Sequence, residues 1–259
     1  MARWLLDCNP LCGHPWQLGL ATEPEERERI YRLRYDVFFR EQQYGHAVNR
    51  TGRDVDEFDE WCDQLFLYDQ SNNQVIGTYR AIHGGEAVKR GGFYGTAEFD
   101  LSPLQSIAAQ ILQGGRTCVA ANYRNGLAIQ YLSYGMELLL RHYGADYFLG
   151  AESFRTNEPE NLNAIYSYVK KYGTDPEWFV QPLPASRVEG LREVPVTEDD
   201  ERLLPGIIRT DLRMGFLACS PPGWDPEFRC YDLLMLGRRD RLTKLYHSFI
   251  DRIERKLLK

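Results

Sequence analysis

The sequence lacks the features that would place it at once in a membrane, secreted or serine-hydrolase class. No run approaches the roughly 18 apolar residues that a membrane-spanning helix needs. The segment from Met1 to Cys8 has no long apolar core of the kind found in secretory signals. The chain shows no Ser-His-Asp arrangement and no nucleophile elbow. We therefore expect a cytoplasmic protein, whose contact with a membrane would be peripheral, at the surface of the inner membrane.

Paired cysteines and an excess of positive charge are also missing. The six cysteines are dispersed without CxxC spacing, and a chain of 259 residues does not need disulfide bonds to fold. Cys8, Cys12 and His14 lie close together but have no matching fourth ligand, so we predict no metal site. The net charge of −6 argues against a nucleic-acid partner.

Positive charge gathers at the C-terminal end. Residues 238–259 hold eight Lys or Arg against three Asp or Glu, on an otherwise acidic chain. Apolar residues recur there every three or four positions, so one helix face is apolar. Such a segment can attract an acidic partner or an anionic membrane surface. It is equally typical of a terminal helix that packs on the core and turns its charged face to solvent.

Hydrophobic periodicity predicts helices alternating with strands of a mixed sheet. Thr22 and Glu25 have the spacing of a capping box, and a helix is expected from there to about Glu41. Strand-like residues on both sides of the Asp69–Asn73 turn predict a hairpin over 63–82. The further expected elements are a strand at 116–120, a helix after Gly126, a strand at 146–151, a helix at 157–172, a strand at 228–236 and a helix at 238–257. The order indicates an α/β (α+β) fold whose sheet is not simply parallel.

The turn between the strand at 116–120 and the next helix is a candidate phosphate site. Backbone N–H groups and the positive helix end can hold an anion there. The residues of this turn are Tyr123, Arg124, Asn125, Gly126 and Ala128. Taken alone the pattern is weak, because many strand-to-helix turns contain an Arg and a Gly.

The same turn resembles the acyl-donor loop of GNAT acyltransferases, usually Arg-x-x-Gly-x-Gly/Ala. Here Arg124-x-Gly126-x-Ala128 is one residue short. The resemblance therefore implies a reduced pyrophosphate loop. It favours acyl-phosphopantetheine on an acyl-carrier protein as donor over coenzyme A, with no tightly bound cofactor.

A second set of residues is spread over most of the chain: Arg34-x3-Phe38-x5-Tyr44, then Asp56-Glu57-Phe58-Asp59, Arg80 and Arg116, with Glu98-Phe99-Asp100-Leu101, Gly115-Arg116-Thr117-Cys118-Val119 and Trp224-Asp225-Pro226-Glu227-Phe228-x3-Asp232. This set resembles the acyl-homoserine-lactone synthases and, more closely, the ornithine-lipid (hemolysin-like) N-acyltransferases and N-acyl amino acid synthases. The resemblance covers roughly residues 20–240. It implies one GNAT-like domain over 1–259, a mostly antiparallel sheet flanked by helices, with a core at about 18–155 and a C-terminal extension at about 156–259.

An amino-acid acceptor brings a carboxylate and an amine. Guanidinium groups suit the carboxylate and carboxylates suit the amine. The candidate acceptor-binding residues are Arg34, Phe38, Tyr44, Asp56, Asp59 and Arg80, with Arg116 beside them. The alternative is a structural ion-pair network that fixes the long loop onto the sheet, and both can hold.

The chemistry needs a base and a donor to the oxyanion. The resemblance implies that a backbone N–H of Cys118-Val119-Ala120 stabilises the oxyanion, and that a Glu often stands where this chain has Gln113. An amide is no base, so Glu98 is the first candidate and Asp100 the second. Arg116, Cys118, Val119 and Glu98 are therefore the predicted catalytic positions.

The predicted activity is transfer of a long acyl chain, with or without a 3-hydroxyl, from acyl-carrier protein to the α-amino group of an amino acid such as ornithine. One alternative is an acyl-homoserine-lactone synthase-like enzyme, which would need S-adenosylmethionine. The other is a non-catalytic GNAT-like module that binds lipid.

Overall fold

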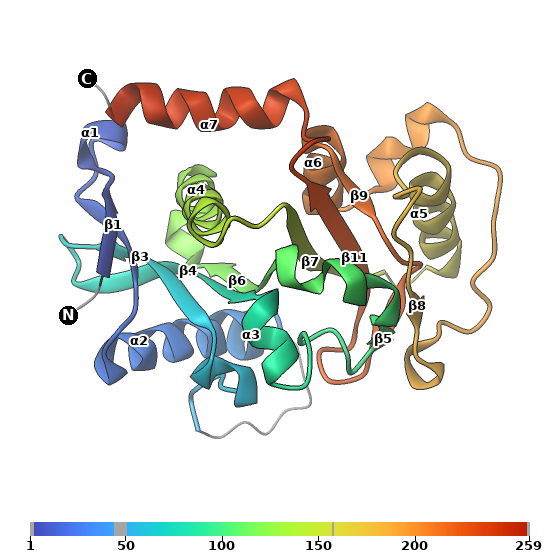
Figure 1. The fold of residues 1–259 in the computed structure, drawn as a ribbon, viewed down its shortest axis with the longest axis horizontal. Coiled ribbons are helices and arrows are strands. Elements are labelled where there is room, and N and C mark those ends of the chain that lie inside the picture. The colour runs from blue at the N-terminus through green and yellow to red at the C-terminus, as the bar shows by residue number, and fades with distance from the viewer. Residues whose placement is uncertain (1–2, 44–50, 157, 258–259) are drawn as a thin grey trace.

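A computed structural model describes residues 3–43, 51–156 and 158–257. Its centre is a nine-stranded sheet in the order β1-β2-β3-β4-β6-β7-β11-β10, with β9 also paired to β11 (Figure 1). The strands are β1 Arg3–Asp7, β2 Trp16–Leu20, β3 Asp63–Asp69, β4 Gln74–His83, β6 Ile111–Val119, β7 Tyr147–Phe154, β9 Phe216–Ala218, β10 Gly223–Asp225 and β11 Cys230–Arg238. Two short strands, β5 Phe99–Asp100 and β8 Gln181–Pro182, form a separate pair.

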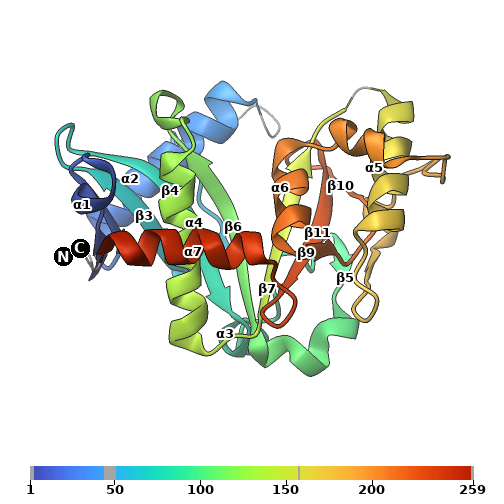
Figure 2. The same cartoon turned by 90° about the horizontal axis from the view of Figure 1, so that it is seen from above.

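Helices cover both faces of the sheet. α4 (Leu127–Tyr143) and α7 (Lys244–Leu257) lie on one face, and α2 (Pro24–Tyr35) and α3 (Gly84–Lys89) on the other (Figures 1 and 2). α7 starts beside α6 (Gly206–Met214) and crosses α4 to reach α1 (Asn9–Cys12), where Lys256 donates to the carbonyl of Leu11. α5 (Pro159–Tyr172) packs with α6 on the C-terminal strands.

Among the described strands, β6 and β7 form the parallel pair of the sheet, and their pairing is short. Ile111–Gly114 pair with Tyr147–Gly150, and the two strands then separate. A glycine is required where they part, because a Cβ on Gly114 would lie 2.7 Å from the rings of both Tyr79 and Phe148. The unpaired halves of the two strands border a gap in the middle of the sheet.

A bulge in β6 lies just beyond this point. Tyr79 of β4 stands opposite both Arg116 and Thr117, and Arg116 has a φ of 50°. A bulge of this kind bends the strand and redirects a side chain. Here it directs Arg116 along the border of the gap rather than into the ladder.

The backbone of β6 beyond the bulge is open on the side of the gap. The N–H of Ala120 donates to the carbonyl of Ile76, next to β4. Backbone groups alternate sides along an antiparallel strand, so those of Val119 point the other way. The Val119 carbonyl indeed accepts a hydrogen bond from Arg124 Nε at 2.8 Å.

The mixed, mostly antiparallel sheet flanked by helices is the predicted fold class, and the β3–β4 hairpin is confirmed. The first predicted helix is confirmed as α2, but Glu23 and Glu26 form its capping box, not Thr22 and Glu25. Its last turn widens into the π-helix η1, Asp36–Glu41. β6 is longer than the predicted strand, and α7 starts six residues later than the predicted helix.

Several elements have no counterpart in the sequence prediction. Among the strands and α-helices these are β1, β2, α1, α3, β5, β8, α6, β9 and β10. In the parts of the chain that the structure describes, no helix is both long enough and apolar enough to cross a membrane.

Candidate active site

The gap between β6 and β7 opens into a cavity of about 1210 Å³. On the α2 face of the sheet its wall carries polar residues such as Arg80, Tyr94 and Glu98 among aromatic ones such as Phe38 and Phe228. On the α4 face its wall comes from α4, α6 and α7 and is largely apolar, with Met136, Met214 and Phe249 among its residues. The cavity thus passes through the sheet and joins two chemically different surfaces.

Five charged residues singled out in the sequence lie in one network. Arg34 holds Asp59 with two hydrogen bonds of 2.6 and 3.0 Å, and Asp59 also accepts from Arg80 at 3.1 Å. Asp56 links the network to Arg116, whose Nη2 lies 3.1 Å from the carboxylate. Asp56 also accepts from Arg80 at 2.5 Å. Sequence reasoning missed a sixth member, Asp54, which pairs with Arg34 Nε at 2.7 Å.

Exposure separates the structural part of this network from the part that a substrate can reach. Arg34 is fully buried and Asp59 is 1% exposed, and neither lines the cavity. The side chains of Arg116 and Asp56 keep 17% and 25% of their surface and do line it. The prediction that Arg34 and Asp59 contact an acceptor is therefore wrong. They hold Asp56, Arg80 and Arg116 in place.

The charges of the network hold Asp59 in its ionised form. Burial by itself would raise the pKa of Asp59, but the hydrogen bonds and charges of Arg34 and Arg80 bring that pKa down to about 2. Because each guanidinium faces a carboxylate, no charge is left alone in the buried part.

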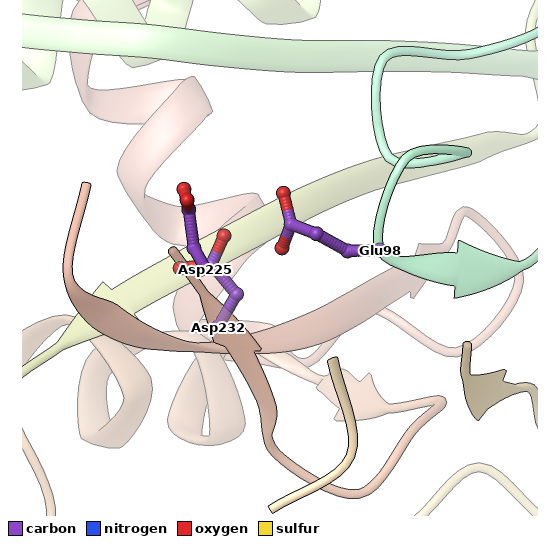
Figure 3. A group of neighbouring side chains, drawn as sticks. All are labelled: Glu98, Asp225 and Asp232. Carbon is purple, nitrogen blue, oxygen red and sulfur yellow. The ribbon is translucent and has the colours of Figure 1, made fainter. Parts of the chain in front are cut away.

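Glu98 belongs to a cluster of three carboxylates. Glu98 precedes β5, Asp225 ends β10 and Asp232 lies in β11, and Figure 3 shows their carboxylate groups pointing toward one another. One carboxylate oxygen from each residue lies within 4.8 Å of those from the other two. Such a group can hold a cation, either a metal ion or an ammonium group. The sequence prediction of no metal did not consider these residues together.

The cluster strongly changes the chemistry of Glu98. Burial, with the negative charges of Asp232 and Asp225, raises the pKa of Glu98 to about 9. Burial also raises the pKa of Asp232. Glu98 is therefore protonated at neutral pH until a positive charge arrives beside it.

Asp225 has a second role. Its Oδ1 accepts from the N–H groups of Glu227 and Phe228, which closes the turn after β10. The Phe228 ring then lies 4.3 Å from the Arg116 guanidinium and packs edge-on against Phe38. Phe38, a predicted acceptor contact, therefore lines the cavity as part of an aromatic wall.

The predicted donor turn is only partly directed at the cavity. Tyr123, Arg124 and Gly126 line it. The hydroxyl of Tyr123 is bound by Asp69, Asn72 and Gln74, and Arg124 forms an ion pair with Glu41 at the end of η1. Asn125 Oδ1 accepts from the N–H of Leu127, the first residue of α4, so it is engaged within the turn. Ala128 is buried in the core, so its side chain is no donor contact.

The remaining predicted positions have clear places. Gln113 is buried and accepts the N–H of Tyr94, so it supports the cavity wall. Asp100 is exposed and accepts a hydrogen bond from the N–H of Ser102. It therefore has a structural role in its loop rather than the position of a base. Burial raises the pKa of Cys118 to about 12, which disfavours its thiolate. Tyr44 lies outside the described residues.

Sequence reasoning missed further residues of the wall. Asp225 and Asp232 belong to a motif on which the resemblance rests, but the sequence predicts no role for either side chain. Glu152 of β7 and Asp211 of α6 are hydrogen-bonded to each other on the α4 face. Burial raises the pKa of Asp211 to about 7 and that of Glu152 well above its ordinary range. No local pattern brings these distant residues together.

Comparisons with known proteins agree with this architecture. Residues 33–134 match the family described as the acetyltransferase (GNAT) domain. An L-ornithine N(alpha)-acyltransferase from Rhizobium meliloti is 29% identical over 89% of this chain and 82% of its own. One from Brucella abortus is 27% identical over 90% and 88%. The structure of FeeM, an N-acyl amino acid synthase from uncultured soil microbes, has a TM-score of 0.52 at 10% identity, covering 90% of this chain and 97% of its own. The fold is GNAT-like.

The network predicts two different outcomes for two neighbouring aspartates. Asp59→Ala removes one of the two carboxylates that each of the buried residues Arg34 and Arg80 contacts, and it should lower the free energy of unfolding by about 3–5 kcal/mol. Asp56→Ala, at the accessible edge, should cost clearly less. Urea unfolding of both variants measures the difference. Equal losses would contradict the division into a buried and an accessible part.

The carboxylate cluster predicts a stability change that depends on pH. A carboxyl group whose pKa is higher in the folded chain loses stability for that chain as pH rises, here from about 4.5 toward about 9. Glu98→Gln should therefore gain stability over the parent chain at pH 8 and not at pH 4.5. Glu86→Gln, a control on the surface of α3, should show no such gain. Melting temperatures at both pH values decide, and an equal shift at both would refute the cluster's effect.

Proposed function

We propose that this chain, with its GNAT-like fold and its similarity to L-ornithine N(alpha)-acyltransferases, transfers a long acyl chain from a thioester to the α-amino group of an amino acid such as ornithine. The observation that carries the proposal is the cavity through the sheet. It joins the wall that carries Arg116 and the carboxylate cluster to a wall in which apolar residues predominate. A reaction between a small zwitterion and a fatty acyl thioester needs both.

The α2 face suits the acceptor. Arg116 offers a partly exposed guanidinium for a carboxylate, and the cluster of Glu98, Asp225 and Asp232 attracts an amine. The second amine of ornithine adds a further positive charge, which fits a site with three carboxylates. Many amino acids carry a single amine, so this surplus of acid favours a diamino acid.

The α4 face suits the acyl chain. Together with this face, the whole cavity is larger than an ordinary small-molecule pocket, which has about 300–1,000 Å³. Ile207 of α6 and Leu245 of α7 line it and are exposed large apolar residues. Burying them against a hydrocarbon chain would be favourable.

The proton balance of the reaction fits Glu98. The acceptor ammonium, once bound beside the cluster, lowers the pKa of Glu98, which releases its proton to solvent. The Glu98 carboxylate then takes a proton from the ammonium group. The free amine attacks the thioester carbon, and the Val119 N–H stabilises the oxyanion. The C–S bond breaks, and the thiolate leaves with a proton. Burial and the neighbouring carboxylates, which raise the pKa of Glu98, make it a stronger base than an ordinary carboxylate.

The donor we propose is an acyl-carrier protein rather than coenzyme A. Arg124, the cation of the shortened turn, is already paired with Glu41. A phosphate that replaced Glu41 would meet one guanidinium and the N-terminal end of α4, which suits a single phosphate. A 3-hydroxyl on the acyl chain is compatible with the polar pair Glu152 and Asp211 in the same wall.

The first three cations of the predicted basic tail are paired with acidic residues in the body of the protein. Arg238 and Arg241 face Glu177, and Arg239 faces Glu137. Arg252 on α7 is exposed and borders the cavity. We therefore propose Arg252, rather than the 238–241 group, as the contact for an acidic carrier protein. Peripheral contact of the same face with an anionic membrane is the related proposal for release of an amphiphilic product.

The activity is tested with palmitoyl- and 3-hydroxypalmitoyl-carrier protein, and the same acyl groups on coenzyme A. Each donor is offered with ornithine, lysine, glycine and tyrosine, and N-acyl products are detected by mass spectrometry. We expect ornithine to be acylated, with at least about tenfold higher efficiency from the carrier protein. Glu98→Gln should lower kcat strongly. Retention of acyl chains without any product would instead favour a lipid-binding module.

The carrier-protein contact is tested by charge reversal. Arg252→Glu should raise the KM for acyl-carrier protein several-fold at low ionic strength and less at high salt, because exposed charges are screened. The KM for a small acyl-pantetheine thioester should not change. Lys89→Glu, on α3 at the other face of the sheet, is the control of equal charge. If both variants behave alike, Arg252 has no special part in docking.

A further inference from the structure

Tyr94 is fixed in the wall of the cavity on the α2 face. Its N–H is held by Gln113 at 3.1 Å, its ring packs edge-on against Phe58, and the Arg80 guanidinium lies 4.6 Å from the ring centre. The ring also covers Gly115 so closely that a Cβ there would lie 2.8 Å from Cε2 and 3.2 Å from the hydroxyl oxygen. The hydroxyl thus lies against β6, next to Arg116.

The described part of the chain offers this rigidly held hydroxyl no hydrogen-bond partner. Among the residues that the structure describes, no side-chain or backbone atom forms a hydrogen bond with the buried Tyr94 hydroxyl. A buried hydroxyl without a partner costs free energy, so such groups are uncommon in folded proteins. When one lines a cavity, a ligand atom is the natural partner.

Two other residues of the cavity wall carry unsatisfied side-chain atoms, and both atoms are hydrogen-bond donors. Within the described part of the chain, Arg80 Nε and Arg116 Nε are buried without a hydrogen bond, although Arg116 Nε lies 3.5 Å from Asp54. Three unsatisfied donors in one wall call for an acceptor group. A carboxylate offers several lone pairs and the opposite charge.

We propose that Tyr94 is a specificity-determining residue whose hydroxyl donates a hydrogen bond to the α-carboxylate of the acceptor amino acid, beside Arg116. The inference rests on the proposed function and assigns one of its contacts. The same turn carries Glu98 four residues later, at the carboxylate cluster. One short segment thereby presents a donor for the acid group of the substrate and acceptors for its amine.

The electrostatic environment keeps Tyr94 in the form that this role needs. Burial is the main cause that raises its pKa well above the ordinary value of 10, although the charge of Arg80 acts in the opposite direction. The phenol therefore stays neutral and keeps its proton as a donor throughout the physiological range.

The test pairs Tyr94→Phe with two acceptors, L-ornithine and L-ornithinamide, which lacks the negative charge. With the acyl-carrier-protein donor, we expect the variant to raise the KM for L-ornithine by about tenfold to a hundredfold, the range for a hydrogen bond to a charged group. The KM for L-ornithinamide and both kcat values should change by less than about twofold, because the amide gains far less from this donor. Tyr143→Phe, whose hydroxyl bonds to Asp63 outside the cavity, is the matched control.

A stability measurement separates this role from a structural one. Removal of an unsatisfied buried hydroxyl should leave the melting temperature of Tyr94→Phe unchanged or higher. A lower melting temperature, with equal kinetic losses for both acceptors, would overturn the proposal. A fall in kcat for both acceptors at unchanged KM would assign the hydroxyl to the reacting thioester and overturn it as well.

Binding measurements keep the inference distinct from the proposed function. Calorimetric titration with L-ornithine and L-ornithinamide needs no turnover. If the parent chain forms no N-acyl product but binds L-ornithine more tightly through Tyr94, the function fails and the contact stands. If the chain is active and Tyr94→Phe binds both acceptors as the parent does, the contact fails alone.

Discussion

The separation of β6 from β7 is the constraint on which the rest of the molecule depends. Backbone groups at the border of the gap leave the ladder after Gly114 and Gly150. Such groups must be satisfied by other partners, and Arg124 does this for the carbonyl of Val119. The rings of Tyr79 and Phe148 fill the space beside Gly114, where the strands separate, and the bulge at Arg116 follows directly. If β6 and β7 were hydrogen-bonded along their whole length, the sheet would have no cavity.

The buried ion pairs serve this open sheet. Networks of this kind contribute little net stability, because desolvation offsets most of the attraction. Their geometric demands are strict, however. Arg34 must meet both Asp54 and Asp59, which ties α2 to the 54–59 loop, and Arg80 and Asp56 extend the link to β6. The network therefore positions Arg116 and its edge of the cavity more than it stabilises the fold.

The two faces of the cavity differ because each strand alternates its side chains. Asp232 of β11 points to the α2 face with Glu98, whereas its strand neighbour Leu233 packs on the opposite side with α5 and α6. Glu152, the partner of Leu233 in the ladder, shares that side. Two groups of carboxylates thus lie on opposite faces, and the raised pKa values in both follow from burial among like charges.

Local pattern in the sequence determined the elements and much of the chemistry. Periodicity indicated α2, α4 and the β3–β4 hairpin, because apolar residues must face a core at helix or strand spacing. The Arg and Asp residues of the network were visible as residue types suited to an amino acid, and the motif that contains Asp225 and Asp232 was visible as a resemblance.

What local pattern does not determine is which of these side chains stays accessible. Arg34 and Asp59 are paired with each other in the interior. Ala128 faces the core, and Gln113 supports the turn that carries Tyr94. Tyr94, Glu152 and Asp211 carry no motif at all. Their meeting depends on contacts between residues far apart in the chain, and only tertiary packing decides which polar groups find partners inside the protein and which are left for a substrate.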